Sequence, residues 1–276
     1  MTIEIEPAGA VGAFVHGVDL TCLSDDQLSH LRAAFAEHSV LFFRDQQLTP
    51  DQHIEFAQTW GVININRFFT PVAEHPQIAL VSKEPDQKLN IGGGWHTEHS
   101  YDQVPALGSM LYALEVPPAG GDTLFASTCA AYASLSDGVK STLANLQAVH
   151  SSRHVFGSNS SRDAEFADRF GNEAAATQDA THPVVITHPL SGRKSLYVNP
   201  GFTLRFKGWT EVESEGLLRS LYDHIGRPEH TYRLSWEPGT LAFWDNRATW
   251  HWAVNDYHGH RRLMHRITLE GEPVSA

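Results

Sequence analysis

His96 and Glu98 stand one residue apart, directly after the glycine run of residues 92–94. In an extended segment, residues i and i+2 point to the same face, so one imidazole and one carboxylate would converge there. A further histidine from elsewhere in the chain would complete the set of two histidines and one carboxylate that holds Fe(II) in non-haem oxygenases. Without such context, the pair is a surface pair on a strand or a simple salt bridge.

A second group of reactive side chains lies in residues 243–271, where a basic cluster follows His251. Period-2 alternation divides residues 262–268 between two faces: Arg262, Met264, Arg266 and Thr268 lie on one, and Leu263, His265 and Ile267 on the other. Two arginines on one strand face cost too much to bury unless anions meet them. A planar guanidinium binds a carboxylate or sulfonate through two parallel hydrogen bonds. The pattern therefore predicts two anions, or one anion and one internal acid, unless this face is simply solvated.

A third segment, GGDTLFAS (120–127), begins with two glycines that allow a close backbone turn. Thr123 then opens an extended run and offers a hydroxyl group. The alternative interpretation is an ordinary strand residue.

Charge limits the partners of this chain. Its net charge is −12, which argues against nucleic acid or an anionic membrane as a partner. The same charge repels small anions, so a site for one must supply its own arginines. Most of the 17 histidines are expected to be ordinary surface or core residues.

Targeting signals and cysteine use indicate a cytoplasmic protein. No run approaches the roughly 20 apolar residues of a membrane span, and the N-terminus lacks the basic and apolar regions of a signal peptide. The two cysteines, Cys22 and Cys129, form neither a disulfide framework nor a metal motif and suit a reducing compartment.

The pattern of elements predicts a mainly β protein with helices outside the core. Capping signals at Ser24, Thr49 and Thr210 begin three amphipathic helices. Short β-rich runs dominate the rest of the chain: 39–43, 77–82, 109–116, 182–189, 195–199, 231–236, 240–246 and 262–269. We therefore expect a double-stranded β-helix (jelly-roll, cupin-like) core in a single domain spanning residues 1–276. The polar segment 157–182 is interpreted as a long excursion, and a candidate lid, rather than a domain boundary.

Taken together, the His-x-Glu segment, GGDTLFAS and WDNRATWHWAVNDY with the following RRLMHR resemble the TauD/TfdA (taurine dioxygenase-like) family. Members are dioxygenases that depend on Fe(II) and 2-oxoglutarate. The resemblance covers nearly the whole chain, including PAGAVGAFVHGVDL near the N-terminus and LYVNPGFTLRF at 196–206. It implies an oxygenase that hydroxylates a small anionic substrate and releases succinate and CO2, and we expect a homo-oligomer.

The resemblance implies roles for matching positions. His96, Glu98 and His251 would bind the iron. Arg262 would hold the distal carboxylate of 2-oxoglutarate, with Thr123 adding a hydrogen bond.

The resemblance also implies a substrate pocket. Arg266 matches the arginine that binds the sulfonate in taurine dioxygenase. Phe156 and Phe202 match aromatic pocket residues, and Trp244 would lie near the metal. His99 would reach the substrate through its backbone.

Two departures from the family pattern bear on function. The metal motif is normally His-x-Asp, and Glu98 adds one methylene group to the carboxylate arm. In the pocket, Asn66 stands where taurine dioxygenase has a sulfonate-binding histidine, and Phe69 replaces a tyrosine. The substrate therefore stays open among a sulfonate, a carboxylate such as an aryloxyalkanoate, and a sulfate ester.

The altered metal motif leaves two other classes to be weighed. One is a protein of this fold that binds metal and 2-oxoglutarate without turnover, and the other is a structural protein with zinc in the site. Arg262 and Thr123 argue against the zinc protein, because that class needs no anchor for 2-oxoglutarate.

Overall fold

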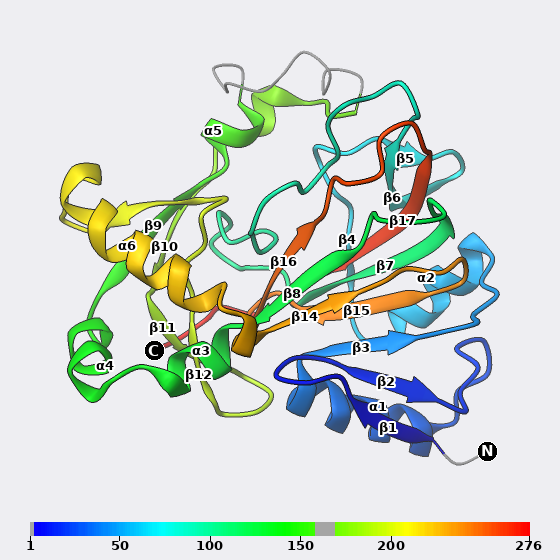
Figure 1. Ribbon diagram of the computed structural model, residues 1–276, viewed down its shortest axis with the longest axis horizontal. Helices are drawn as coiled ribbons and strands as arrows, with labels where there is room; N and C mark the ends of the chain where they lie inside the picture. The colour runs from blue at the N-terminus through cyan, green and yellow to red at the C-terminus, as the bar shows by residue number, and fades with distance from the viewer. Residues whose placement is uncertain (1–2, 158–168) are drawn as a thin grey trace.

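A computed structural model describes residues 3–157 and 169–276 of the chain (Figure 1). Its strands are β1 (Glu4–Pro7), β2 (Ala13–His16), β3 (Val40–Phe43), β4 (Ile63–Asn64), β5 (Pro71–Val72), β6 (His75–Lys83), β7 (Gly108–Glu115), β8 (Thr123–Ser127), β9 (Gln147–Ser151), β10 (Asp179–Pro183), β11 (Val185–Thr187), β12 (Lys194–Leu196), β13 (Thr203–Phe206), β14 (Thr231–Leu234), β15 (Leu241–Asp245), β16 (Thr249–Ala253) and β17 (Arg262–Leu269). The helices are α1 (Asp25–His38), α2 (Pro50–Gln58), α3 (Thr128–Ser134), α4 (Asp137–Leu143), α5 (Arg153–Phe156) and α6 (Glu211–Ile225), with 3₁₀ turns η2 (Glu173–Ala175) and η3 (Pro228–His230).

Two sheets face each other across the core. The larger has the order β1-β2-β3-β15-β7-β17-β6-β5, with β4 paired to β17, and it is mixed because β2 and β3 run parallel. The smaller has the order β14-β8-β16. Phe42 of the large sheet meets Phe125 of the small one with ring centroids 5.6 Å apart. This arrangement confirms the predicted mainly β class with a jelly-roll core.

Helices cover the outer faces of both sheets. Helices α1 and α2 pack on the large sheet, where Phe35 stacks on Phe243 with centroids 4.1 Å apart. On the far side of the small sheet, α3 and α6 pack around Trp250. In Figure 1, α1 overlaps β1 and β2 of the large sheet at the lower edge of the view, and α6 lies at the left. The helices therefore lie outside the core, as the sequence predicts.

Capping residues set where the three predicted helices begin. Ser24, Thr49 and Thr210 each accept a hydrogen bond from the backbone N–H three residues later, and the side chain at that later position bonds back. All three are therefore capping boxes, as the sequence predicts.

The alternation predicted for residues 262–268 is confirmed in β17. Arg262, Met264 and Arg266 are buried on the face toward the space between the sheets, whereas Ile267 packs with the helices on the outer face. Two buried arginines thus point into the core from one strand.

Some expected elements differ in extent. The expected strand 182–189 is divided between β10 and β11, because β10 pairs with β9 while β11 pairs with β12. Residues 158–168, part of the expected excursion 157–182, lie outside the described residues. The end of that segment forms β10.

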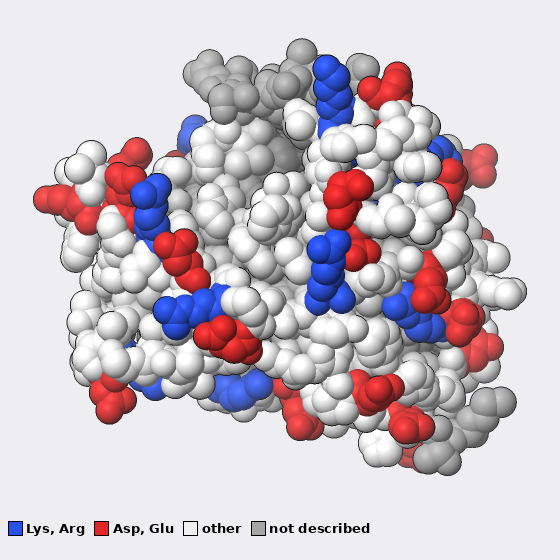
Figure 2. All heavy atoms as spheres, in the orientation of Figure 1, with Lys and Arg blue, Asp and Glu red and all other residues white. Residues whose placement is uncertain are grey.

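The surface in view carries charges of both signs. Figure 2 shows acidic and basic side chains interspersed over this face. Among the described residues, every helix is too short or too polar to cross a lipid bilayer.

Candidate active site

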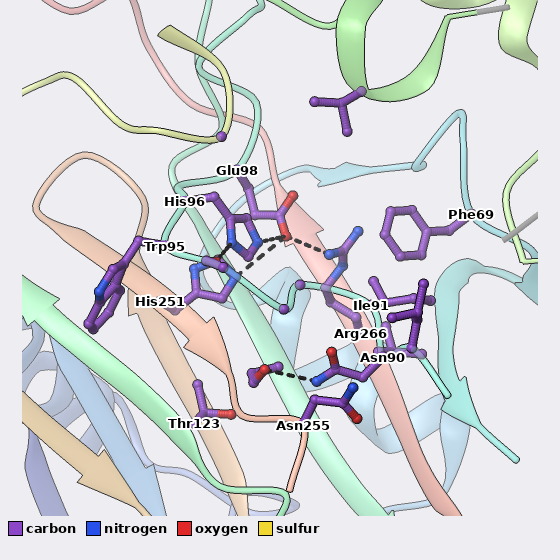
Figure 3. Close-up of a pocket in the computed structure, with 18 of the residues that line it drawn as sticks. Phe69, Asn90, Ile91, Trp95, His96, Glu98, Thr123, His251, Asn255 and Arg266 are labelled. Atoms are coloured by element: carbon purple, nitrogen blue, oxygen red, sulfur yellow. Dashed lines mark hydrogen bonds and ion pairs between the residues drawn. The ribbon is translucent and has the colours of Figure 1, made fainter. Parts of the chain in front are cut away.

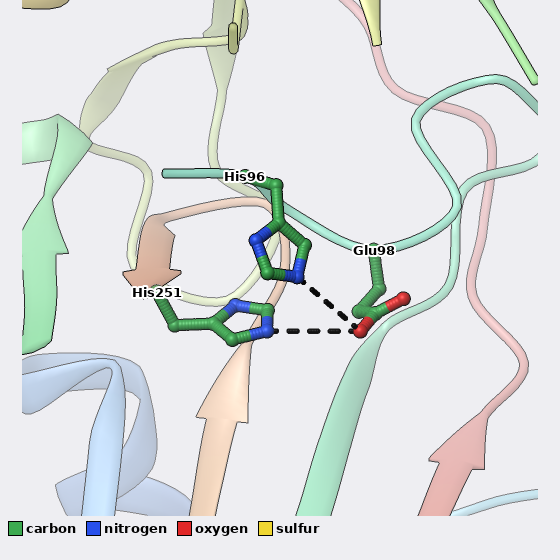
Figure 4. Close-up of side chains that lie close together, drawn as sticks. All are labelled: His96, Glu98 and His251. Carbon is green, nitrogen blue, oxygen red and sulfur yellow. Dashed lines mark ion pairs between the residues drawn. The ribbon is translucent and has the colours of Figure 1, made fainter. Parts of the chain in front are cut away.

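Three potential metal ligands converge at one end of the space between the sheets. Oε1 of Glu98 lies 3.7 Å from Nε2 of His96 and 3.6 Å from Nε2 of His251 (Figure 4). Each of the three residues offers one ligand atom, and these atoms all lie within 4.8 Å of one another. In the described part of the chain, this is the group of histidine and carboxylate side chains close enough together to hold a metal ion. The two segments that the sequence singled out therefore meet, although 155 positions separate His96 from His251.

A short β-bridge joins the two histidines. The N–H of His96 donates to the carbonyl of His251 across 3.1 Å, and the N–H of His251 donates back across 2.9 Å. The sequence predicted an extended segment for His96 and Glu98, but only His96 belongs to this bridge and Glu98 begins a turn. The turn brings the carboxylate round to the imidazoles.

The glycine run gives the backbone room beside His96. Gly92 has φ +78°, and a Cβ there would lie 3.2 Å from Cε1 of His96. The carbonyl of Gly94 accepts a hydrogen bond from Nδ1 of His96 at 2.8 Å. This contact places the proton on Nδ1 and leaves the Nε2 lone pair toward Glu98, the tautomer that a metal ligand needs.

Arg266 completes the polar group at this end of the site. Its Nη1 donates to Oε1 of Glu98 at 2.6 Å, and its guanidinium carbon lies 4.0 Å from the centroid of the Phe69 ring (Figure 3). Its Nε and Nη2 atoms are buried and have no partner among the described residues. The arginine therefore keeps two donors for a further acceptor.

These contacts decide the charge states. Burial raises the pKa of Glu98, but the Arg266 guanidinium and the two imidazoles outweigh it and hold that pKa well below its usual range. Burial, with a smaller effect of His96, lowers the pKa of His251 to about 4. At neutral pH the site thus offers a carboxylate and a neutral His251 imidazole, the forms in which both side chains bind metals.

A second cationic group lies further along β17. Arg262 is 4% exposed, and its Nε and Nη2 atoms have no partner among the described residues. Thr123 begins β8 and lines the same cavity as Arg262. A buried guanidinium and a hydroxyl on one cavity wall can bind a carboxylate together.

The cavity that joins these groups measures about 640 Å³, within the range of small-molecule sites. The predicted pocket residues Phe69, Phe156, Phe202 and Trp244 all line it, together with the three metal-binding candidates, Thr123 and both arginines. Figure 3 shows Glu98 and Arg266 turned toward each other, with Phe69 beside them. The cavity thus combines one polar end with aromatic walls.

Asn66 and His99, also expected in the pocket, do not line this cavity. Oδ1 of Asn66 accepts from the backbone N–H groups of Phe68 and Phe69, which fixes a turn. His99 has φ +56°, and its Nδ1 lies 2.9 Å from Oδ2 of Asp102. Both side chains therefore hold loops in place, and their contact with substrate stays a prediction.

Sequence reasoning missed other parts of the wall, because they come together only through tertiary packing. These residues are Val81, Leu89, Asn90, Ile91, Trp95, Leu111, His154, Val155, Phe170, Pro200, Gly201, Ala253 and Asn255. The apolar alternation of β6 and β7 indicates buried strands, but it does not show which side chains reach a cavity.

The residues fit the groups that the resemblance implies. Two imidazoles and one carboxylate on one side of a cavity suit Fe(II) and leave the other side open. Arg262 and Thr123 offer donors to a carboxylate at a separate point of the same cavity.

Comparisons with known proteins agree with this geometry. The family model described as "Taurine catabolism dioxygenase TauD, TfdA family" matches residues 4–268. An alkylsulfatase of Acinetobacter baylyi is 36% identical over 96% of this chain and 83% of its own length. An alpha-ketoglutarate-dependent sulfate ester dioxygenase of Pseudomonas putida is 34% identical over 99% of this chain and 91% of its own length.

A solved structure shows the same fold. A taurine dioxygenase from Burkholderia xenovorans superposes with a TM-score of 0.84 at 35% identity, covering 100% of this chain and 93% of that chain. The jelly-roll core expected from the sequence is therefore confirmed.

Proposed function

The chain belongs to the TauD/TfdA family of dioxygenases, and we propose that its reaction is the hydroxylation of a monoanionic organic substrate, with a sulfate ester favoured. It is an Fe(II)- and 2-oxoglutarate-dependent oxidoreductase, as its relatives are. The comparisons support this catalytic function over the non-catalytic binding protein that the His-x-Glu motif left open.

His96, Glu98 and His251 would hold the Fe(II) ion. Arg262 and Thr123 would bind the distal carboxylate of 2-oxoglutarate and thereby orient its other end toward the metal. With O2, the bound metal and cosubstrate supply the oxidant that inserts oxygen into a substrate C–H bond, with release of succinate and CO2.

The charges in the cavity carry the proposal of a monoanion. Among the described side chains that line the cavity, the Glu98 carboxylate and the guanidinium groups of Arg262 and Arg266 together carry a net charge of +1. A divalent metal and the doubly negative 2-oxoglutarate cancel each other. A buried charge is costly without a partner, and one negative charge on the substrate neutralises the remainder.

The position of the free donors indicates where that anion would bind. Nε and Nη2 of Arg266 are buried and unpartnered beside the metal-binding carboxylate. A substrate anion there would place the neighbouring carbon close to the metal. The walls formed by Phe69, Phe156 and Phe202 would contact an apolar body and exclude water.

A sulfate ester matches this arrangement and the activities named for two relatives. Hydroxylation of the carbon that bears the sulfate oxygen gives an unstable adduct. Its C–O bond to sulfate breaks as the new hydroxyl loses its proton, yielding an aldehyde and inorganic sulfate. The oxidation is balanced by the conversion of O2 and 2-oxoglutarate to succinate and CO2.

The proposal includes a reducing compartment such as the cytoplasm. Cys22 and Cys129 are both free thiols, one exposed and one buried. Free exposed thiols and Fe(II) are both maintained under reducing conditions.

An anaerobic titration tests the metal and cosubstrate sites. Adding 2-oxoglutarate to the Fe(II)-loaded protein should produce a weak metal-to-ligand charge-transfer band in the visible spectrum. The absence of this band in wild type would reject the proposal, because it would show that no chelate forms at the metal.

Exposure to air in the presence of alkyl sulfates, alkanesulfonates and aryloxyalkanoates then tests the substrate. Succinate formation coupled to aldehyde and sulfate release, with alkyl sulfates preferred, supports the sulfate ester. If succinate formation is coupled only to alkanesulfonates or aryloxyalkanoates, that class replaces the sulfate ester as the proposed substrate. The His251→Ala variant serves as the inactive control.

A further inference from the structure

Trp236 contacts both residues that would hold the cosubstrate carboxylate. It follows β14 by two residues, is 7% exposed and packs in the core between the sheets. Its indole Nε1 donates to Oγ1 of Thr123 at 2.9 Å, and the guanidinium carbon of Arg262 lies 5.6 Å from its ring centroid. Trp236 itself does not line the cavity.

The hydrogen bond fixes the role of the Thr123 hydroxyl. An indole N–H can only donate, so the threonine oxygen must be the acceptor. The hydroxyl proton then points away from Trp236 and is available to another acceptor. Because Thr123 lines the cavity, that acceptor can be a ligand oxygen.

The ring holds Arg262 without neutralising it. A carboxylate beside the guanidinium would fix its position equally well, but would also use its donors and cancel its charge. An aromatic face attracts a cation and leaves the N–H groups unused. This agrees with the unpartnered Nε and Nη2 atoms of Arg262.

We propose that Trp236 is a positioning residue for the cosubstrate: it presets the Thr123 hydroxyl as a donor and Arg262 as an unpaired cation, so that both meet the distal carboxylate of 2-oxoglutarate. The inference rests on the proposed function, because it needs 2-oxoglutarate to bind at these two residues. A tryptophan that only filled the core would serve any ligand of this cavity equally.

That difference defines the experiment. Wild type and the Trp236→Phe variant, which keeps an aromatic ring but loses the N–H, are loaded with Fe(II) under anaerobic conditions. Each is titrated with 2-oxoglutarate and with 2-oxopentanoate, which chelates the metal in the same way but has a methyl group in place of the distal carboxylate. The charge-transfer band reports both affinities.

Thr123→Val, which removes the hydroxyl at nearly constant shape, should weaken 2-oxoglutarate binding about tenfold, the effect of roughly one hydrogen bond to a charged group. Trp236→Phe keeps that hydroxyl and loses only its fixed orientation, so it should weaken 2-oxoglutarate binding by a smaller factor, about fivefold. Both variants should change 2-oxopentanoate binding less than about twofold. The double variant should be no weaker than Thr123→Val alone, because both changes break the same interaction.

Trp60→Phe provides the matched control. Trp60 packs against Phe35 and Phe243 under the large sheet, and its indole N–H has no partner among the described residues. This variant should leave both affinities unchanged.

Unchanged 2-oxoglutarate affinity in Trp236→Phe, or equal losses for both ligands, would overturn the positioning role. Should Trp236→Phe fail to fold, Trp236→Leu, which also lacks the indole N–H and keeps Thr123, gives the same decision. Failure of the proposed function looks different, because wild type itself would then show no band with 2-oxoglutarate.

Discussion

Arg266 donates from Nη1 to Oε1 of Glu98 across 2.6 Å, and both side chains are buried. The same carboxylate oxygen faces the imidazoles of His96 and His251. The longer glutamate arm thus reaches the two proposed metal-binding histidines and the proposed substrate arginine at once. The proposed metal-binding group and the proposed substrate-binding group thus share one oxygen atom, and this sharing governs the first two predictions.

Shortening this arm should separate the two interactions. Glu98→Asp removes one methylene, about 1.5 Å of reach, so the carboxylate can meet the metal but no longer Arg266 as well. We expect turnover to be preserved or raised, and the KM for an anionic substrate to fall by up to about tenfold because Arg266 gains a donor. Steady-state succinate formation measures both constants. Complete loss of turnover, with the 2-oxoglutarate charge-transfer band intact, would mean that the pocket is built around the longer acid.

Removing Arg266 should destabilise the metal-free protein most. Arg266→Met leaves the Glu98 carboxylate buried without its main cationic partner, which costs about 3–5 kcal/mol. A bound divalent cation compensates the same carboxylate, so Mn(II) should restore more stability in the variant than in wild type. Chemical denaturation with and without Mn(II) measures this difference. Equal metal effects in both proteins would show that Arg266 does not compensate Glu98.

Arg262 should be needed for 2-oxoglutarate binding, whereas its neighbour Arg261 should not. Arg262→Ala should weaken 2-oxoglutarate binding by at least about a hundredfold, because two charged hydrogen-bond donors are lost. The affinity for the metal should be retained. Arg261→Ala is the matched control, because Arg261 pairs with Glu84 and Glu115 at the surface and should leave 2-oxoglutarate binding unchanged. Anaerobic titration measures both. Unchanged binding in Arg262→Ala would reject its assignment as the cosubstrate anchor.

The sequence predicted the elements whose signals are local. The capping boxes at Ser24, Thr49 and Thr210 depend on neighbours three residues apart, and the alternation of β17 depends on neighbours two apart. Both kinds of signal placed elements close to their observed bounds.

Contacts between distant strands could not be predicted in this way. The pair of Glu98 and Arg266 depends on how the turn after His96 lies over β17, and no local pattern contains that relation. For the same reason the contact of Trp236 with Thr123 was missed, although both segments were expected to be extended. The resemblance supplied roles for residues matched one by one, but not the contacts between them.

A buried histidine outside the candidate active site should make the fold sensitive to acid. Both ring nitrogens of His53, on α2, are buried without a partner among the described residues. Burial, with a smaller effect of His265, lowers the pKa of His53 to about 3. Its folded pKa thus lies below its unfolded value, so the unfolded chain binds the proton first. The stability that neutral His53 contributes to the fold is fully present above about pH 6.5 and is lost as the pH falls toward 3.

When the pH is lowered from 7.5 to 5, His53 should decrease the free energy of unfolding by about 2 kcal/mol. The decrease is about 1.4 kcal/mol for each pH unit below 6.5. His53→Phe has no proton to bind and keeps a ring against Tyr112, so it should lose about 2 kcal/mol less than wild type over the same range. Urea denaturation of the two proteins at both pH values measures the difference, in which other titrating groups cancel. Parallel losses would show that His53 is already protonated, or hydrated, in the folded protein.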